Sequence, residues 1–141
     1  MMKLRSKKRY QIKRILKKWD GDINMSELAR LSNTTKQELA WWRTSDNTTI
    51  CNPIIGINKM RTLFEEIKNS DEITDKQFKR FKKCVNMAAI CTKYFGGSSA
   101  TVSVTISRHD PNVYRREIKR ACHHLLKKST TKKVEFKVKL K

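Results

Sequence analysis

Apolar residues recur at helical spacing through most of this 141-residue chain, and this pattern constrains its fold more than any other feature. In the first segment Ile12, Ile15 and Trp19 fall on one side of a helix, and basic side chains fall on the other. We therefore predict an amphipathic helix over residues 5–19 that ends at Asp20–Gly21.

Two short helices are predicted next, each introduced by a capping signal. Asn24 is followed three residues later by Glu27, and Thr35 is followed by Glu38. In such a capping box each side chain bonds the backbone N–H of the other residue, which satisfies groups that a helix end leaves unpaired. The pattern predicts a helix after Asn24, a turn of three residues, and a helix over 36–45.

Two amphipathic helices are predicted in the middle of the chain. Residues 54–69 carry apolar side chains at helical spacing. Residues 75–95 form a longer stretch, which begins with a capping box of Thr74 and Gln77 and ends at Gly96–Gly97. We predict one continuous helix over this second stretch.

The last third of the chain changes its periodicity. Residues 101–107 alternate between aliphatic side chains and Ser or Thr, which is the pattern of a half-buried strand. A helix is predicted next, with Asp110 as its cap and Pro111 in its first position. Residues 134–140 alternate again, so the order is strand, helix, strand. The two strands must be parallel if they are neighbours.

The sequence thus predicts an α+β fold, mainly α, with two units. Residues 1–50 would form a basic unit of three helices, and residues 51–141 would hold the middle helices and a C-terminal strand-helix-strand unit. Two parallel strands bury too little surface to be stable alone. The middle helices would cover them in one arrangement, and a homodimer paired through the C-terminal strands would do so in another.

The net charge of +20, from 33 Lys and Arg against 13 Asp and Glu, indicates a polyanionic partner. Residues 1–18 contain nine basic residues and no acidic one, and residues 101–141 contain twelve basic and three acidic ones. No apolar stretch is long enough for a membrane span or a signal peptide. We expect an intracellular protein, cytoplasmic or associated with nucleoid or nucleus, that does not bind membranes.

Residues 25–44 combine a small residue, a turn residue and a shared apolar core. Ala29 would let two helices approach, Asn33 would adopt the left-handed backbone of the turn, and Leu39 would join the core. The segment resembles the helix-turn-helix motif of repressor-type DNA-binding proteins, although Ser32 stands where that motif usually has an apolar residue. The resemblance implies that the second helix enters the major groove with its N-terminal end toward the bases.

The resemblance also implies which side chains would contact DNA. Gln37 has the bidentate geometry for adenine, Lys36 would reach guanine or phosphate, and Thr35 would bond a phosphate. Trp41 would face outward and stack or contact a thymine methyl, or else pack on the first helix or on residues 54–57. The predicted DNA contacts are Thr35, Lys36, Gln37, Ala40, Trp41, Arg43 and Thr44.

Basic residues at both ends of the chain are predicted to contact phosphates, because each Lys or Arg that neutralises a phosphate releases a counterion. The alternatives are a solvated face or, for the C-terminal helix, a docking surface for an acidic protein. The predicted phosphate contacts are Lys7, Lys8, Arg9, Lys13, Arg14, Lys17, Arg115, Arg116, Lys119 and Arg120.

No cofactor, metal site or catalytic site is predicted. The four cysteines lack the paired spacing of zinc ligands. Asp110 and Glu117 are interpreted as a helix cap and a surface residue, so no catalytic arrangement is distinguishable and we expect no enzyme activity.

The sequence therefore predicts a DNA-binding protein, such as a transcriptional regulator or a DNA-associated accessory factor of a virus, phage or mobile element. DNA is favoured over RNA because residues 25–44 resemble a helix-turn-helix motif, whereas the predicted strands of a C-terminal RNA-binding unit lack the exposed aromatics that stack bases. Two alternatives remain open. One is an RNA-binding or ribonucleoprotein component that uses both basic ends, and the other is a basic interaction module that inhibits an acidic partner.

Overall fold

A computed structural model describes the backbone of residues 2–44 and 53–129, and the side chains of residues 10–40 and 53–129. Every regular element in these ranges is a helix, so the predicted α+β fold class is wrong. The elements are α1 (Met2–Trp19), α2 (Met25–Leu31), α3 (Lys36–Thr44), α4 (Ile54–Asn69), α5 (Asp75–Cys84), α6 (Met87–Ile90), the π-helix η1 (Cys91–Phe95), α7 (Ser99–Arg108), the 3-10 helix η2 (Pro111–Tyr114) and α8 (Arg115–Lys128).

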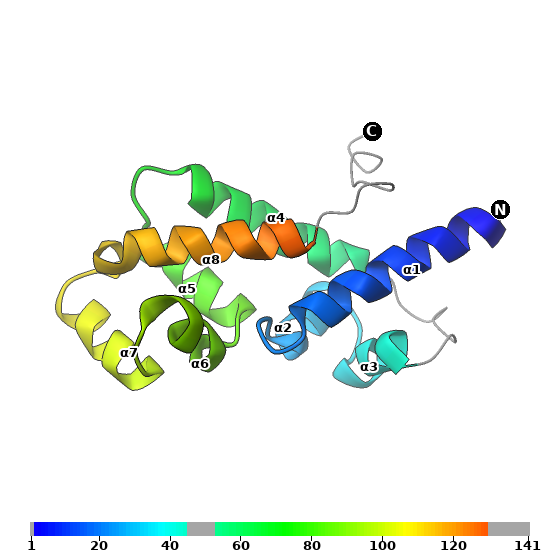
Figure 1. Ribbon diagram of the computed structural model, residues 1–141, viewed down its shortest axis with the longest axis horizontal. Helices are drawn as coiled ribbons and strands as arrows, with labels where there is room; N and C mark the ends of the chain where they lie inside the picture. The colour runs from blue at the N-terminus through cyan, green and yellow to red at the C-terminus, as the bar shows by residue number, and fades with distance from the viewer. Residues whose placement is uncertain (1, 45–52, 130–141) are drawn as a thin grey trace.

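Helices α4 and α8 lie side by side in opposite directions and make the most extensive helix–helix contact among the described residues (Figure 1). Helix α2 contacts both α4 and α5, and α1 contacts α3 and α8. Along the longest axis, α3 lies toward one end and α7 toward the other (Figure 1). The N-terminal helices and the C-terminal helix are therefore parts of one packed arrangement.

A chain of aromatic rings runs through the core. Trp19 meets Phe64 edge-on at 6.1 Å between ring centroids, and Phe64 meets Phe81 in the same way at 6.3 Å. The Trp19 indole N–H donates to the carbonyl of Leu125 at 3.0 Å, so its one polar atom is satisfied although the side chain is fully buried. These contacts join α1, α4, α5 and α8 in a single apolar core.

Most of the predicted helix starts are confirmed. Thr74 and Gln77 form the predicted capping box of α5, and Asp110 accepts from the N–H of Asn112 ahead of Pro111. Only one of the two hydrogen bonds of the capping box predicted for Asn24 and Glu27 forms. Asn24 caps α2, but its own N–H donates to the carbonyl of Cys84 at 2.9 Å and the Glu27 carboxylate binds Arg30 instead.

The predicted strand over 101–107 is wrong, because these residues form most of α7. Ser98 caps this helix by accepting from the N–H of Thr101. Val102 and Ile106 are one helical turn apart on the inner side, whereas Val104 is 51% exposed. Alternation at every second position includes pairs spaced by four residues, so this segment satisfied the helical pattern as well.

The predicted continuous helix over 75–95 is also wrong, because Val85 and Asn86 interrupt it. Asn86 donates its N–H to the carbonyl of Asp22, and Val85 forms an antiparallel bridge with Ile23. Pairing with this distant turn gives Val85 an extended backbone that a continuous helix does not allow. The chain becomes helical again in α6 and η1. This helical segment ends at Gly96, which has a left-handed backbone.

The predicted second strand, residues 134–140, lies outside the described residues. The same holds for a homodimer paired through it. The described part of the chain holds no strand-helix-strand unit, because α7 stands where its first strand was predicted.

Candidate nucleic-acid interface

The turn between α2 and α3 has the backbone that its sequence predicts. Asn33 has a φ of 57°, in the left-handed region that asparagine tolerates, and the N–H of Thr34 returns to the carbonyl of Ala29 at 2.9 Å. Ala29 and Leu39 are both buried. This geometry fixes where α3 starts relative to α2.

Ser32 stands where the helix-turn-helix motif usually has an apolar residue, and its contacts explain why a polar residue fits there. It is 4% exposed, accepts from the N–H of Gly56 at 3.0 Å and donates to the carbonyl of Pro53 at 3.4 Å. Helix α4 has no side-chain cap of its own, because Pro53 occupies its N-cap position. Ser32 therefore caps α4 from the turn between α2 and α3 and ties this turn to the core.

The first turn of α3 is anchored by a capping box and open to solvent. Thr35 and Glu38 bond each other's backbone N–H at 3.1 and 3.0 Å, and the Thr34 hydroxyl also donates to Glu38. The hydrogen bonds from Thr34 and Thr35 lower the pKa of Glu38. Thr35, Lys36 and Gln37 are exposed.

The remaining predicted DNA contacts divide into two groups. Ala40 is half-buried, so only part of it is accessible. Trp41, Arg43 and Thr44 lie on the α3 backbone, but their side chains are outside the described set. The structure thus brings Thr35, Lys36 and Gln37 together on one exposed helix end.

Helix α1 carries the first set of predicted phosphate contacts next to α3. Arg14 and Lys17 are exposed, and Arg14 lies over the ring of Tyr10 at 5.8 Å from its centroid. Lys13 is half-buried. Lys7, Lys8 and Arg9 lie on the N-terminal half of α1, with side chains outside the described set.

The predicted phosphate contacts on α8 are placed differently from those on α1, because some of them bind backbone carbonyls. The Lys119 ammonium donates to the carbonyls of Lys68, at 3.2 Å, and Ser70. Arg115 donates to the carbonyl of Asp71 at 2.9 Å. Both therefore satisfy carbonyls at the end of α4 and just beyond it, a role that sequence spacing did not indicate.

The other two predicted phosphate contacts on α8, Arg116 and Arg120, differ from each other in whether they bind a carbonyl. Arg120 donates to the carbonyl of Tyr94 at 3.3 Å, whereas Arg116 is exposed. Helix α8 begins near α7, toward the end of the long axis opposite α3 (Figure 1). The structure therefore does not bring the α8 set together with the exposed end of α3.

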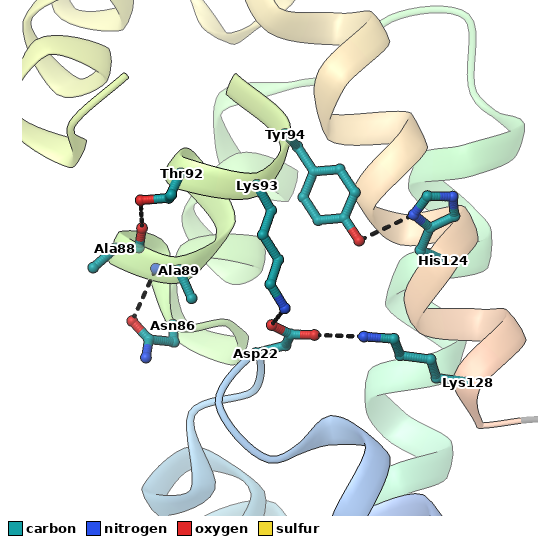
Figure 2. A network of polar contacts seen from close by, with 9 residues as sticks. All are labelled: Asp22, Asn86, Ala88, Ala89, Thr92, Lys93, Tyr94, His124 and Lys128. Atoms are coloured by element: carbon teal, nitrogen blue, oxygen red, sulfur yellow. Dashed lines mark hydrogen bonds and ion pairs between the residues drawn. The ribbon is translucent and has the colours of Figure 1, made fainter. Parts of the chain in front are cut away.

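A buried carboxylate that sequence reasoning missed connects distant segments (Figure 2). Asp22 is 1% exposed and binds Lys93 at 2.6 Å and Lys128 at 2.8 Å, one lysine on each oxygen. Burial alone would raise the pKa of Asp22, but hydrogen bonds from Lys128 and Lys93 outweigh it and lower the pKa. Close by, the Tyr94 hydroxyl lies 3.0 Å from Nδ1 of His124.

The described cysteines are buried thiols. Burial raises the pKa of Cys84 to about 12 and also raises the pKa of Cys91 and Cys122, so all three are protonated at neutral pH. Within residues 2–44 and 53–129, no group of three or more His, Cys, Asp or Glu side chains is placed to hold a metal ion. Over the same ranges, none of the helices has the length and apolar character of a membrane span.

Comparison with protein-family models, with curated proteins and with solved structures finds no match to this chain. The candidate interface consists of the exposed end of α3, the turn that positions it, and the basic side of α1.

Proposed function

We propose that this chain binds nucleic acid, with duplex DNA favoured, by placing the N-terminal end of α3 in the major groove. Gln37 would read a base edge, Lys36 would contact guanine or phosphate, and Thr35 would bond a phosphate. Arg14 and Lys17 of α1 would contact the flanking phosphates. Such a protein would act as a transcriptional regulator or DNA-associated accessory factor.

One observation carries the proposal: α3 has an exposed polar end on a rigidly held helix. Asn33 sets the turn, Leu39 buries the opposite side of α3, and Thr35 with Glu38 fixes its first turn. A reading helix needs this combination, because side chains on a mobile segment would lose entropy on binding.

The Glu38 carboxylate narrows how the end of α3 can approach DNA. Its hydrogen bonds keep it ionised, so a negative charge lies two residues from Lys36. A phosphate placed beside Glu38 would be repelled. The basic side of α1 is therefore the main source of phosphate contacts, and α3 contributes contacts to base edges.

The test is selection of random duplexes by the full chain, followed by sequencing. We expect an enriched motif that changes or disappears with Gln37→Ala. Lys17→Gln should weaken binding to all sequences and reduce the magnitude of the salt slope, d log K/d log[salt], by about one. Lys76→Gln, on the exposed side of α5, is the matched control and should do less than Lys17→Gln.

The opposite results would contradict the proposal. If no motif is enriched, α3 does not read bases. If structured RNA is preferred over every duplex, with losses concentrated at Arg116, the chain is an RNA binder that uses α8. If nucleic acid binds only at low salt and without preference, the basic surface serves another acidic partner.

A further inference from the structure

A basic groove lies between α2, α4 and α5, and nothing above assigns a role to it. Its cavity volume is about 380 Å³. Each helix contributes to the rim: Arg30 from α2, Lys59 from α4, and Arg80 with Lys83 from α5. We call this set the basic groove. Its volume falls in the range of sites that hold small molecules, roughly 300–1,000 Å³.

The walls of the basic groove are held by hydrogen bonds on two sides. Ser32 joins the end of α2 to Gly56 of α4 at 3.0 Å. Asn24, ahead of α2, donates its backbone N–H to the carbonyl of Cys84 and its amide to the carbonyl of Lys83. These hydrogen bonds fix the three helices relative to one another, which lowers the entropy cost of ordering the walls on binding.

The positive charges of the basic groove are incompletely balanced. The one acidic residue in its lining, Glu27, is bound by both nitrogens of Arg30 that face it, at 3.0 and 2.5 Å. Lys59, Arg80 and Lys83 have no side-chain hydrogen bond or ion pair to any described residue. Three cations that repel one another thus surround one cavity, and an anion between them would relieve that repulsion.

A separate observation shows that these charges converge. The thiol of Cys84 lines the groove; burial raises its pKa and the Glu27 carboxylate adds to that rise, whereas Arg80, Arg30 and Lys83 each act in the opposite direction. Three side chains from two helices therefore direct positive potential at the same point. Leu31, which is half-buried, adds an apolar surface beside it, and the buried Leu63 lies beneath.

We propose that the basic groove binds a nucleotide, with a phosphate held by Lys59, Arg80 and Lys83 and with the base against Leu31. Phosphate oxygens accept hydrogen bonds from the N–H groups of arginine and lysine. A base has a flat apolar face that can pack against a leucine side chain. The nucleotide is either free in solution or one unit of a single strand. The proposal goes beyond α3, because none of these residues is a predicted DNA contact.

The test compares two doubly substituted full-length chains. Arg80→Gln with Lys83→Gln removes two charges from the basic groove. Lys76→Gln with Lys79→Gln removes two charges from the exposed side of the same helix and is the matched control. Calorimetry with ADP and with inorganic pyrophosphate, and fluorescence anisotropy with a labelled single-stranded 12-mer, measure binding to each chain. All four substituted residues are exposed, so both variants should remain folded, which circular dichroism would verify.

The expected result is that the groove variant weakens binding at least about 10-fold while the control changes it less than about 3-fold. Loss of ADP and pyrophosphate binding identifies a free nucleotide as the source of the phosphate. Loss of 12-mer binding alone identifies the strand. Equal effects of the two variants on every probe, or no binding of any probe by the unsubstituted chain, would overturn the proposal.

The same experiment separates this proposal from the function proposed for α3. Gln37→Ala, which tests base reading by α3, should leave ADP binding unchanged. Binding of ADP without an enriched duplex motif would retain the nucleotide site and reject the DNA reader, and the reverse result would do the opposite.

Discussion

Replacing Ser32 with alanine should destabilise the fold although the side chain removed is small. Its hydroxyl is the only side-chain partner that the described residues offer to the buried N–H of Gly56, in the first turn of α4. Alanine cannot accept that hydrogen bond, and Ser32 is too buried for water to replace it readily. The loss of a helix cap and an unpaired buried N–H together predict a cost of about 1–2 kcal/mol.

Gly56 offers a second change that acts on the same contact. A Cβ there would lie 2.3 Å from the Ser32 hydroxyl and 2.8 Å from the carbonyl oxygen of Leu28, so either α2 or α4 must move. We expect Gly56→Ala to cost roughly 1–4 kcal/mol, because overpacking and the displaced cap outweigh the better helix propensity of alanine. Ser32→Ala removes the hydroxyl from this clash, so the double variant should cost about 1 kcal/mol less than the two single costs combined.

Urea unfolding followed by circular dichroism measures these costs. At a slope of about 2 kcal/mol per M, a cost of about 1–2 kcal/mol shifts the midpoint by roughly 0.5–1 M. Ser26→Ala, at an exposed serine of the preceding helix α2, is the control and should change stability by less than about 0.5 kcal/mol. An unchanged midpoint for Ser32→Ala, or strict additivity in the double variant, would refute the reasoning.

Three further predictions concern positions elsewhere in the core and the turn. Asn33→Gly should keep or raise the melting temperature, whereas Asn33→Ala should cost about 1 kcal/mol, because only alanine is strained at positive φ; equal effects would contradict this. Asp22→Asn should cost about 1–3 kcal/mol at pH 7, toward the low end for a buried pair because Lys93 and Lys128 reach solvent. The folded pKa of Asp22 is below its ordinary 3.8, so this stabilisation is complete above that pH and is lost as pH falls through the folded pKa; a difference in unfolding free energy between the two chains that does not narrow as the pH is lowered below 3.8 would exclude it. Trp19→Phe should cost about 1–3 kcal/mol by thermal unfolding through the lost hydrogen bond to α8 and the smaller ring, and an unchanged melting temperature would argue against that contact.

Local signals in the sequence predicted the helices where the controlling interactions are local. The capping box of Thr74 with Gln77 involves residues three apart, and the left-handed turn at Asn33 depends on one side chain. The prediction for Glu27 failed because Asn24 found a partner in Cys84, 60 positions away in the printed sequence. A long-range backbone bond replaced the local one.

The two larger errors have the same origin. Val85 and Asn86 leave the helix because residues 22–24 pair with them, and nothing near residue 85 in the sequence specifies that partner. In residues 101–107 the alternation fitted a strand, but the core accepts only the helical pair of Val102 and Ile106. Tertiary packing decided between two readings that the sequence allowed.

The candidate site was predictable only in part. The exposed end of α3 follows from a continuous segment, so Lys36 and Gln37 were found by position alone. The basic groove combines Arg30 with Lys83, which no motif spacing connects. Lys119 was assigned to phosphate, but its ammonium binds carbonyls at the end of α4, because folding placed unsatisfied acceptors within its reach.

The bonds that hold the end of α1 also bear on the order in which the protein can acquire its structure during synthesis. Trp19 reaches Leu125 and Asp22 reaches Lys128, each across 106 positions of the chain. A growing chain that has emerged only as far as α5 has the residues of α2 and α3 but not the helix that buries this indole and pairs this carboxylate. Completion of the core must wait for α8, so a nascent chain would expose Trp19 throughout that interval and offer a surface for chaperones to bind.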